Sequence, residues 1–164
     1  MLFRSQYLKT SRVRLKTTYA VASEPLASLT GWHERCIIWE SARPYFYART
    51  TPEGRAMIGG ADDDFIDVGR RDRALPGKAR KLVRRFHKMF PQIEFNPAYR
   101  WAGVFGDSDD GLPFIGDCTD LPNAYFGIGY GGNGVVFSVI AAKIIRDLHL
   151  GKRNPDAGLF CFDR

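Results

Sequence analysis

Glycines near the end of the chain have a spacing that could hold a phosphate group. In the stretch YFGIGYGGNGVVFSVIAAKIIRDL, Gly127, Gly129 and Gly132 match the pattern G-x-G-x-x-G. In dinucleotide-binding folds this pattern joins a strand to a helix, and an acid that binds ribose follows at the end of the next strand. Here Asp147 lies inside the predicted helix, and only LFCF remains as a possible further strand. A Rossmann-type pyrophosphate site is therefore not predicted.

The same glycines, placed directly before a helix, could serve another ligand. Without Cβ atoms the backbone can approach a flat or bulky group, and the unpaired N–H groups of the first helical turn would face that group. These amides and the helix dipole would stabilise an anion, or a ring that becomes anionic during a reaction. Tight packing of the strand against the helix is the alternative role for the glycines, and the spacing alone leaves both open.

Neither a metal centre nor a hydrolytic centre is predicted. Cys36, Cys118 and Cys161 and the three histidines are scattered without metal-ligand spacing, and we expect reduced, structural cysteines. The acidic stretch DSDDG lacks the length and terminal glutamate of a calcium loop, so it predicts a turn. No Ser-His-Asp or Cys-His arrangement can be argued from the spacing.

Composition limits the classes of partner. The 164 residues are 45% apolar, enough for the core of one compact unit, and carry a net charge of +6. No apolar run is long enough to span a bilayer and no secretory signal is present, so we predict a cytoplasmic protein. Between Arg70 and Lys88 there are nine basic residues and one acid. Without interleaved aromatic residues this basic surface is predicted to face solvent, and nucleic-acid binding is not predicted.

The periodicities predict an α+β fold with a mixed, mostly antiparallel sheet and flanking helices. Alternating residues predict a strand from Arg12 to Ala22, and RPYFYART and RAMIGG, joined by the turn TPEG, predict a hairpin. ADDDFIDVGRRDRALPG is predicted to be a connection. LPGKARKLVRRFHKMFP predicts an amphipathic helix that Pro91 ends, with Leu82, Val83, Phe86, Met89 and Phe90 on its apolar face. NAYFGIG predicts the last strand, before a helix from Gly134 to about Gly151.

Two motifs resemble a known enzyme family. WAGVFGDSDDGLPFIGD, followed by NAYFGIGYGGNGVVFSVIAAKIIRDL, resembles the C-terminal signature of FAD-dependent oxidoreductases of the D-amino acid oxidase, glycine oxidase and sarcosine oxidase type. Upstream, TTYAVASEPL and ARPYFYARTTPEGRAMIGGADDDF resemble the substrate domain of that family. The resemblance implies that residues 1–117 belong to the substrate domain and residues 118–164 to the strand and helix that return to the FAD-binding domain. No counterpart is found for the family's first strand, turn and helix, which hold the ADP half of FAD.

The resemblance implies a reaction and a cofactor site. Members of the family transfer a hydride from a carbon that bears an amine to flavin N5 and form an imine. The turn before the last helix would lie beside the isoalloxazine ring, and its backbone amides would stabilise negative charge at the N1/C2 carbonyl edge. The implied FAD-binding residues are Tyr130, Gly131, Gly132, Asn133, Gly134 and Val135.

The substrate residues depart from the family pattern. Phe105 falls about where the amino-acid oxidases carry an arginine that binds the substrate carboxylate, and Gly132 takes the place of a second arginine of some members. The substrate class is therefore left open between an amine and an amino acid. On a predicted strand, Arg43, Tyr45, Tyr47 and Arg49 alternate and could line a substrate pocket, although ordinary strand surface would show the same pattern.

Two hypotheses follow for the chain as a whole. In the first, it is the substrate-side and flavin-edge part of the oxidoreductase, inactive and colourless without an FAD-binding half that a partner chain could supply. In the second, it is a non-catalytic domain of the same descent that binds a small molecule or a protein. An apolar surface left exposed where the FAD domain docks would favour self-association, so we expect a dimer.

Overall fold

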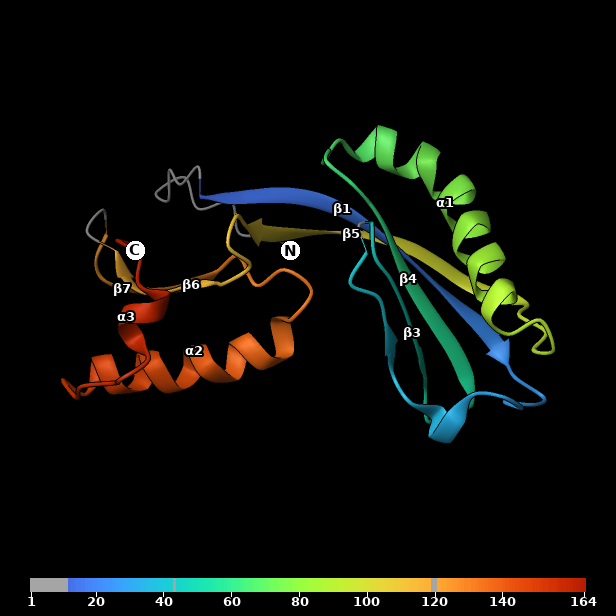
Figure 1. Ribbon diagram of the computed structural model, residues 1–164. Coiled ribbons are helices and arrows are strands. Elements are labelled where there is room, and N and C mark those ends of the chain that lie inside the picture. The colour runs from blue at the N-terminus through green and yellow to red at the C-terminus, as the bar shows by residue number, and fades with distance from the viewer. Residues whose placement is uncertain (1–11, 43, 119–120) are drawn as a thin grey trace. The chain divides into compact units, whose positions relative to one another are not determined.

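The computed structural model describes residues 12–42, 44–118 and 121–164 and confirms the α+β class (Figure 1). The chain divides into two compact units, Lys16–Val104 and a second unit of Phe105–Arg164 with the described residues before Lys16. The predicted division at residues 117 and 118 concerns the family's two domains and stays a prediction. The strands are β1 (Val13–Pro25), β2 (Ile38–Trp39), β3 (Phe46–Thr50), β4 (Arg55–Asp63), β5 (Pro97–Ser108), β6 (Phe114–Cys118) and β7 (Leu121–Ile128). The helices are η1 (His33–Arg35, a 3-10 turn), α1 (Val68–Met89), α2 (Gly134–His149) and α3 (Ala157–Phe160).

The larger sheet has the strand order β2-β3-β4-β1-β5. Its β2–β3, β3–β4 and β4–β1 pairs are antiparallel. The β3–β4 hairpin is the predicted one, and its turn closes with the amide of Gly54 donating to the carbonyl of Thr51 at 3.0 Å. The alternation and the turn residues thus specified these strands correctly.

Helix α1 packs on this sheet through the predicted apolar face. Leu82 and Phe86 are buried against Phe46 and Ile58 of the sheet, and Phe90 closes the same core. Val83 and Met89 are partly buried beside them. Burial of each large side chain stabilises the fold by about 1.5–3 kcal/mol, which explains why the helix adopts this rotation.

The start of α1 differs from the prediction, because Val68 to Ala74 are helical rather than part of a connection. The side chain of Asp67 caps the helix and accepts a hydrogen bond from the amide of Arg70 at 2.6 Å. Pro76, the second residue of the segment predicted to be helical, lies inside the helix. A favourable cap and continued packing therefore outweigh the backbone hydrogen bond that the proline cannot donate.

The prediction that the basic surface of α1 faces solvent is wrong for two of its residues, Lys78 and Arg85. Lys78 donates to the carboxylate of Asp63 at 2.6 Å and to the carbonyl of Ala61 at 2.7 Å. Arg85 forms an ion pair with Glu40 of the loop after β2. Both cations thus tie the helix to the sheet, whereas Lys81, Arg84 and Lys88 are exposed.

The second unit holds the last hairpin and its helices. β6 and β7 pair in antiparallel fashion from Phe114 opposite Ile128 to Asp117 opposite Tyr125. Ile115, Ala141, Ile144 and Phe160 form the buried core between this hairpin, α2 and α3. The predicted strand NAYFGIG and the helix after it are confirmed, whereas LFCF, considered as a possible further strand, begins within α3 and forms no strand.

Among the described residues, no helix has the length and apolar composition to cross a membrane. The thiols of Cys36 and Cys161 are free. The described residues contain no group of three or more candidate metal ligands. The cytoplasmic location stays a prediction.

Candidate functional site

The glycine-rich turn, Tyr130 to Asn133, joins β7 to α2 and is bonded to the end of β5. The amide of Gly131 donates to the carbonyl of Gly106 at 2.8 Å, and Tyr130 forms a β-bridge with Asp107. Gly131 has φ = +54°, a left-handed conformation that favours glycine. The end of β5 therefore sets the position of this turn within its unit.

The first N–H groups of α2 donate no hydrogen bond within the helix. The bond from the amide of Phe137 to the carbonyl of Asn133 begins the helical pattern, and the side chain of Asn133 makes no capping bond. Within the described ranges, the N–H groups of Gly134, Val135 and Val136 have no hydrogen-bond acceptor. Unpaired amides and the helix dipole leave partial positive charge at this end of α2.

The glycines of this region serve two different purposes. A Cβ atom on Gly127 would stand 2.2 Å from the hydroxyl oxygen of Tyr130, and one on Gly129 would stand 3.2 Å from a methyl carbon of Val13. These two glycines permit packing. A Cβ atom on Gly134 would meet no described atom within 4 Å, and the neighbouring Val135 is 83% exposed. The space beside Gly134 and the adjoining amides fit the edge of a flat, anionic group.

Tyr130 closes one side of the turn. Its ring stacks on that of Phe137 with centroids 6.4 Å apart and an interplanar angle of 29°. Burial raises the pKa of the Tyr130 phenol, which therefore stays neutral at physiological pH. The side chain thus supports the turn as a packed aromatic ring, and its backbone joins the turn to Asp107.

The predicted substrate residues Tyr45, Tyr47 and Arg49 share one face of the larger sheet. Phe46 and Ala48, which alternate with them, are fully buried in the core beneath α1, so these three lie on the opposite face. Tyr47 is paired with Gly59, and its ring covers that residue so closely that a Cβ atom there would be 2.3 Å from Cζ of Tyr47. The close approach explains why β4 carries a glycine at this position.

A row of residues extends from Tyr47 across the sheet face. The pairing register places Trp39 of β2 beside Tyr47, and Ala20 of β1 beside Gly59. Two small residues thus lie next to two large aromatic residues, and Trp39 is 60% exposed. Trp39, Gly59 and Ala20 could not be recognised as neighbours from the sequence, because their alignment depends on the register between strands.

The electrostatics of this face combine a phenol and a guanidinium. Burial raises the pKa of Tyr47, and the nearby charge of Arg49 partly opposes that shift. The rings of Tyr45 and Tyr47 lie 6.3 Å apart. Aromatic rings beside a guanidinium can bind the apolar part and the carboxylate of a small substrate.

The remaining predicted substrate residues are not brought into this group. Arg43 lies outside the described residues. Phe105 is a partly buried residue of β5 and belongs to the second unit, together with the glycine-rich turn. Trp101 of β5, a large aromatic side chain, is 41% exposed.

Comparison with protein families places the chain among the flavin-dependent oxidoreductases. It matches the family described as DAO, FAD dependent oxidoreductase, over residues 2–148, and the chain belongs to this family. The family's cofactor is FAD, in agreement with the resemblance inferred from the sequence motifs. A comparison with curated proteins finds no match.

Solved structures share the fold at low sequence identity. Glycine oxidase from Geobacillus kaustophilus is 18% identical with a TM-score of 0.69, covering 93% of this chain and 40% of that protein. L-proline dehydrogenase from P. horikoshii is 18% identical with a TM-score of 0.72, covering 94% and 41%. Iminodiacetate oxidase from Chelativorans sp. BNC1 is 13% identical with a TM-score of 0.69, covering 88% and 38%. The chain thus spans about two fifths of the length of these structures.

Proposed function

We propose that this chain forms the substrate-side and flavin-edge part of an FAD-dependent oxidoreductase that oxidises an amine or an amino acid. Membership of the DAO family supports the cofactor. The names of the similar solved structures refer to glycine, L-proline and iminodiacetate, all compounds that contain an amine nitrogen. These names support the substrate class for the chain.

One observation carries the proposal: among the described residues, the amides of Gly134, Val135 and Val136 at the start of α2 have no acceptor, and a Cβ atom on Gly134 would meet no atom within 4 Å. Tyr130, Gly131, Gly132, Asn133, Gly134 and Val135 would hold the isoalloxazine edge of FAD. The cofactor, when bound, supplies the acceptor for the hydride. The chain's own contribution is to present fixed N–H dipoles to negative charge on the ring, without the reorganisation that water would need.

The aromatic face of the larger sheet carries side chains suited to binding an amine or an amino acid. Tyr47 provides a flat apolar surface, Arg49 provides a cation, and Gly59 leaves the backbone of β4 without a protruding side chain. We propose that Tyr45, Tyr47 and Arg49 bind and orient the substrate. Because Phe105 stands where the amino-acid oxidases carry a carboxylate-binding arginine, we propose that the substrate is an amine, or an amino acid held through Arg49.

We propose that catalysis requires an FAD-binding half, because the chain spans only about two fifths of the similar structures. The test is the visible absorption spectrum of the chain, purified alone and together with a separately expressed FAD-binding half of a family member. We expect a colourless chain alone, and flavin absorption with amine oxidation in the combined sample. A chain that oxidises amines by itself, or an assembled pair that holds FAD and oxidises no amine, would contradict the proposal.

A further inference from the structure

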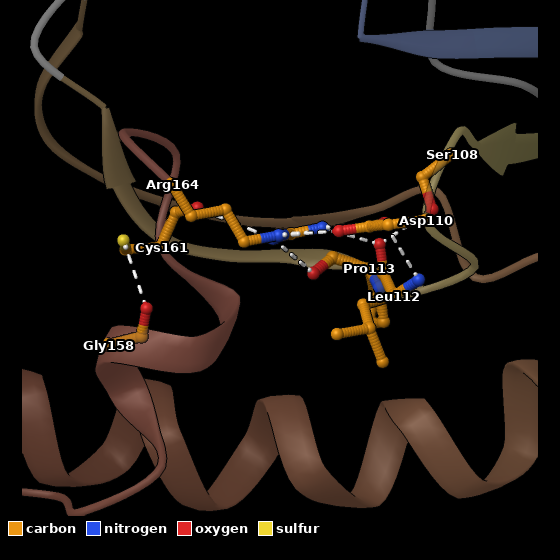
Figure 2. Close-up of polar contacts among 7 residues, drawn as sticks. All are labelled: Ser108, Asp110, Leu112, Pro113, Gly158, Cys161 and Arg164. Carbon is orange, nitrogen blue, oxygen red and sulfur yellow. Dashed lines mark hydrogen bonds and ion pairs between the residues drawn. The ribbon is translucent and has the colours of Figure 1, made fainter.

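Every N–H group of the Arg164 guanidinium has a hydrogen-bond acceptor (Figure 2). Its Nε and Nη2 atoms bind the two carboxylate oxygens of Asp110 at 3.0 and 3.2 Å. Nη2 also donates to the carbonyl of Leu112 at 2.7 Å, and Nη1 donates to the carbonyls of Pro113 and Cys161 at 2.9 and 3.3 Å. The side chain is only 15% exposed.

The guanidinium geometry makes this contact specific for arginine. Five N–H groups in one plane meet five acceptors, and the guanidinium carbon lies 3.8 Å from the centre of the Phe114 ring. A lysine has three N–H groups on one atom and cannot match a carboxylate and three carbonyls at once. The contact therefore depends on the shape of the side chain as well as on its charge.

Three of the four partner residues of Arg164, namely Asp110, Leu112 and Pro113, lie in the turn between β5 and β6. Inside this turn, the hydroxyl of Ser108 donates to the carbonyl of Leu112 at 2.7 Å, and the amide of Leu112 donates to Asp110 at 3.0 Å. Asp110 itself is half exposed, with a side-chain exposure of 49%. Arg164 thus closes the outer side of a turn that is otherwise held by its own short-range bonds.

The same strand end holds the glycine-rich turn. Gly106 accepts the amide of Gly131 at 2.8 Å, and Asp107 bridges Tyr130, directly before the Ser108–Pro113 turn that Arg164 binds. We propose that Arg164 is a positioning residue for the glycine-rich turn, because it fixes the turn that continues the supporting strand end. The link to FAD rests on the proposed function, whereas the link between Arg164 and Gly131 does not.

Amide hydrogen exchange, followed by NMR on the full chain, tests this link without flavin. We expect Arg164→Ala to speed exchange of the Gly131 amide about tenfold relative to the Ile144 amide in the buried face of α2. Arg164→Lys should not restore protection, because its ammonium group cannot make the planar contacts. Arg153→Ala, at an exposed arginine in the loop between α2 and α3, is the matched control and should leave the Gly131 to Ile144 ratio unchanged.

An equal acceleration at Gly131 and Ile144 would overturn the proposal, since it would show only a general loss of stability. Unchanged exchange at Gly131 in Arg164→Ala would do the same. If Arg164→Ala does not fold, Asp110→Asn keeps the bonds from Arg164 to the carbonyls and should produce a smaller increase, of about threefold, confined to Gly131. No change at Gly131 in that variant would also overturn the proposal. Flavin titration of the unsubstituted chain reports separately on the proposed function.

Discussion

The hydroxyl of Tyr130 lies directly over the α-carbon of Gly127, where a Cβ atom would be only 2.2 Å from the hydroxyl oxygen. Gly127 belongs to β7 and Tyr130 to the turn that follows, so this contact folds the turn back onto the strand. The glycine is needed here for packing. Gly134, seven residues later by number, has open space instead, and the two positions should respond differently to the same substitution.

Gly127→Ala should destabilise the chain by about 1–3 kcal/mol, because the added methyl group forces the Tyr130 ring to move. Urea unfolding at neutral pH measures this change. Tyr130→Phe removes the closest atom and should recover part of the lost stability in the double variant. Full additivity of the two substitutions would contradict the contact.

Gly134→Ala should have the opposite effect on stability. Alanine at the first helical position raises the free energy of unfolding by up to about 1 kcal/mol, since nothing described lies where the methyl group enters. In the enzyme assembled with its FAD-binding half, the same methyl group should weaken FAD binding, which a flavin-fluorescence titration measures. A variant that is more stable and binds FAD as well as the unsubstituted chain would contradict the proposed cofactor contact.

The Asp110–Arg164 ion pair should make stability depend on pH in the acid range. Hydrogen bonds from the Arg164 side chain and from the amide of Leu112 lower the pKa of Asp110 to about 2. Because the folded-state pKa is depressed, the contribution is complete above the unfolded pKa of about 3.9 and is lost as the pH falls toward about 2. Half of the Asp110 side chain is exposed, so we expect a loss of about 1 kcal/mol or less.

Unfolding free energies at several pH values between those limits measure the effect. Asp110→Asn should flatten the pH dependence by the amount assigned to this pair, whereas Asp109→Asn, one residue earlier, should leave more of it in place. Equal pH profiles for the unsubstituted chain and Asp110→Asn would show that the pair adds nothing to stability.

The first turns of α2 should drive self-association of the isolated chain. Val135, Val136 and Val139 are 83%, 61% and 54% exposed, which is unusual for three valines within one helix. We expect a dimer in light scattering, and a monomer when Val136 and Val139 are both replaced by Glu. Lys143→Glu, on the same helix and with the same change of net charge, should remain dimeric. A monomeric unsubstituted chain would contradict the expectation.

The sequence predicts the strands, and which side chains share a face of a strand, better than it predicts which strands pair with each other. Alternation alone placed Tyr45, Tyr47 and Arg49 on one face, because Phe46 and Ala48 between them must be buried. The strand order and the row from Trp39 to Ala20 depend on pairing between distant segments, for which the local pattern carries no signal.

The start of α1, the contacts of Arg164 and the separate roles of the glycines were not predicted from the sequence. The early start of α1 was not predicted because its cap, Asp67, lies in an acidic stretch that resembles a loop. Arg164 contacts Asp110 across 54 residues, so nothing in its neighbourhood indicates a role. The glycine-rich turn was recognisable from its composition, but only the structure separates its packing glycines from the open position at Gly134.

The central claim is that the amides at the start of α2 meet the isoalloxazine ring. An NMR titration of the nitrogen-15-labelled chain with lumiflavin, which carries the ring without the dinucleotide, tests it directly. We predict shifts concentrated at the amides of Gly132, Gly134, Val135 and Val136, reduced in Gly134→Ala. Unmoved resonances at these amides up to the solubility limit of lumiflavin, or shifts confined to other parts of the chain, would contradict the account.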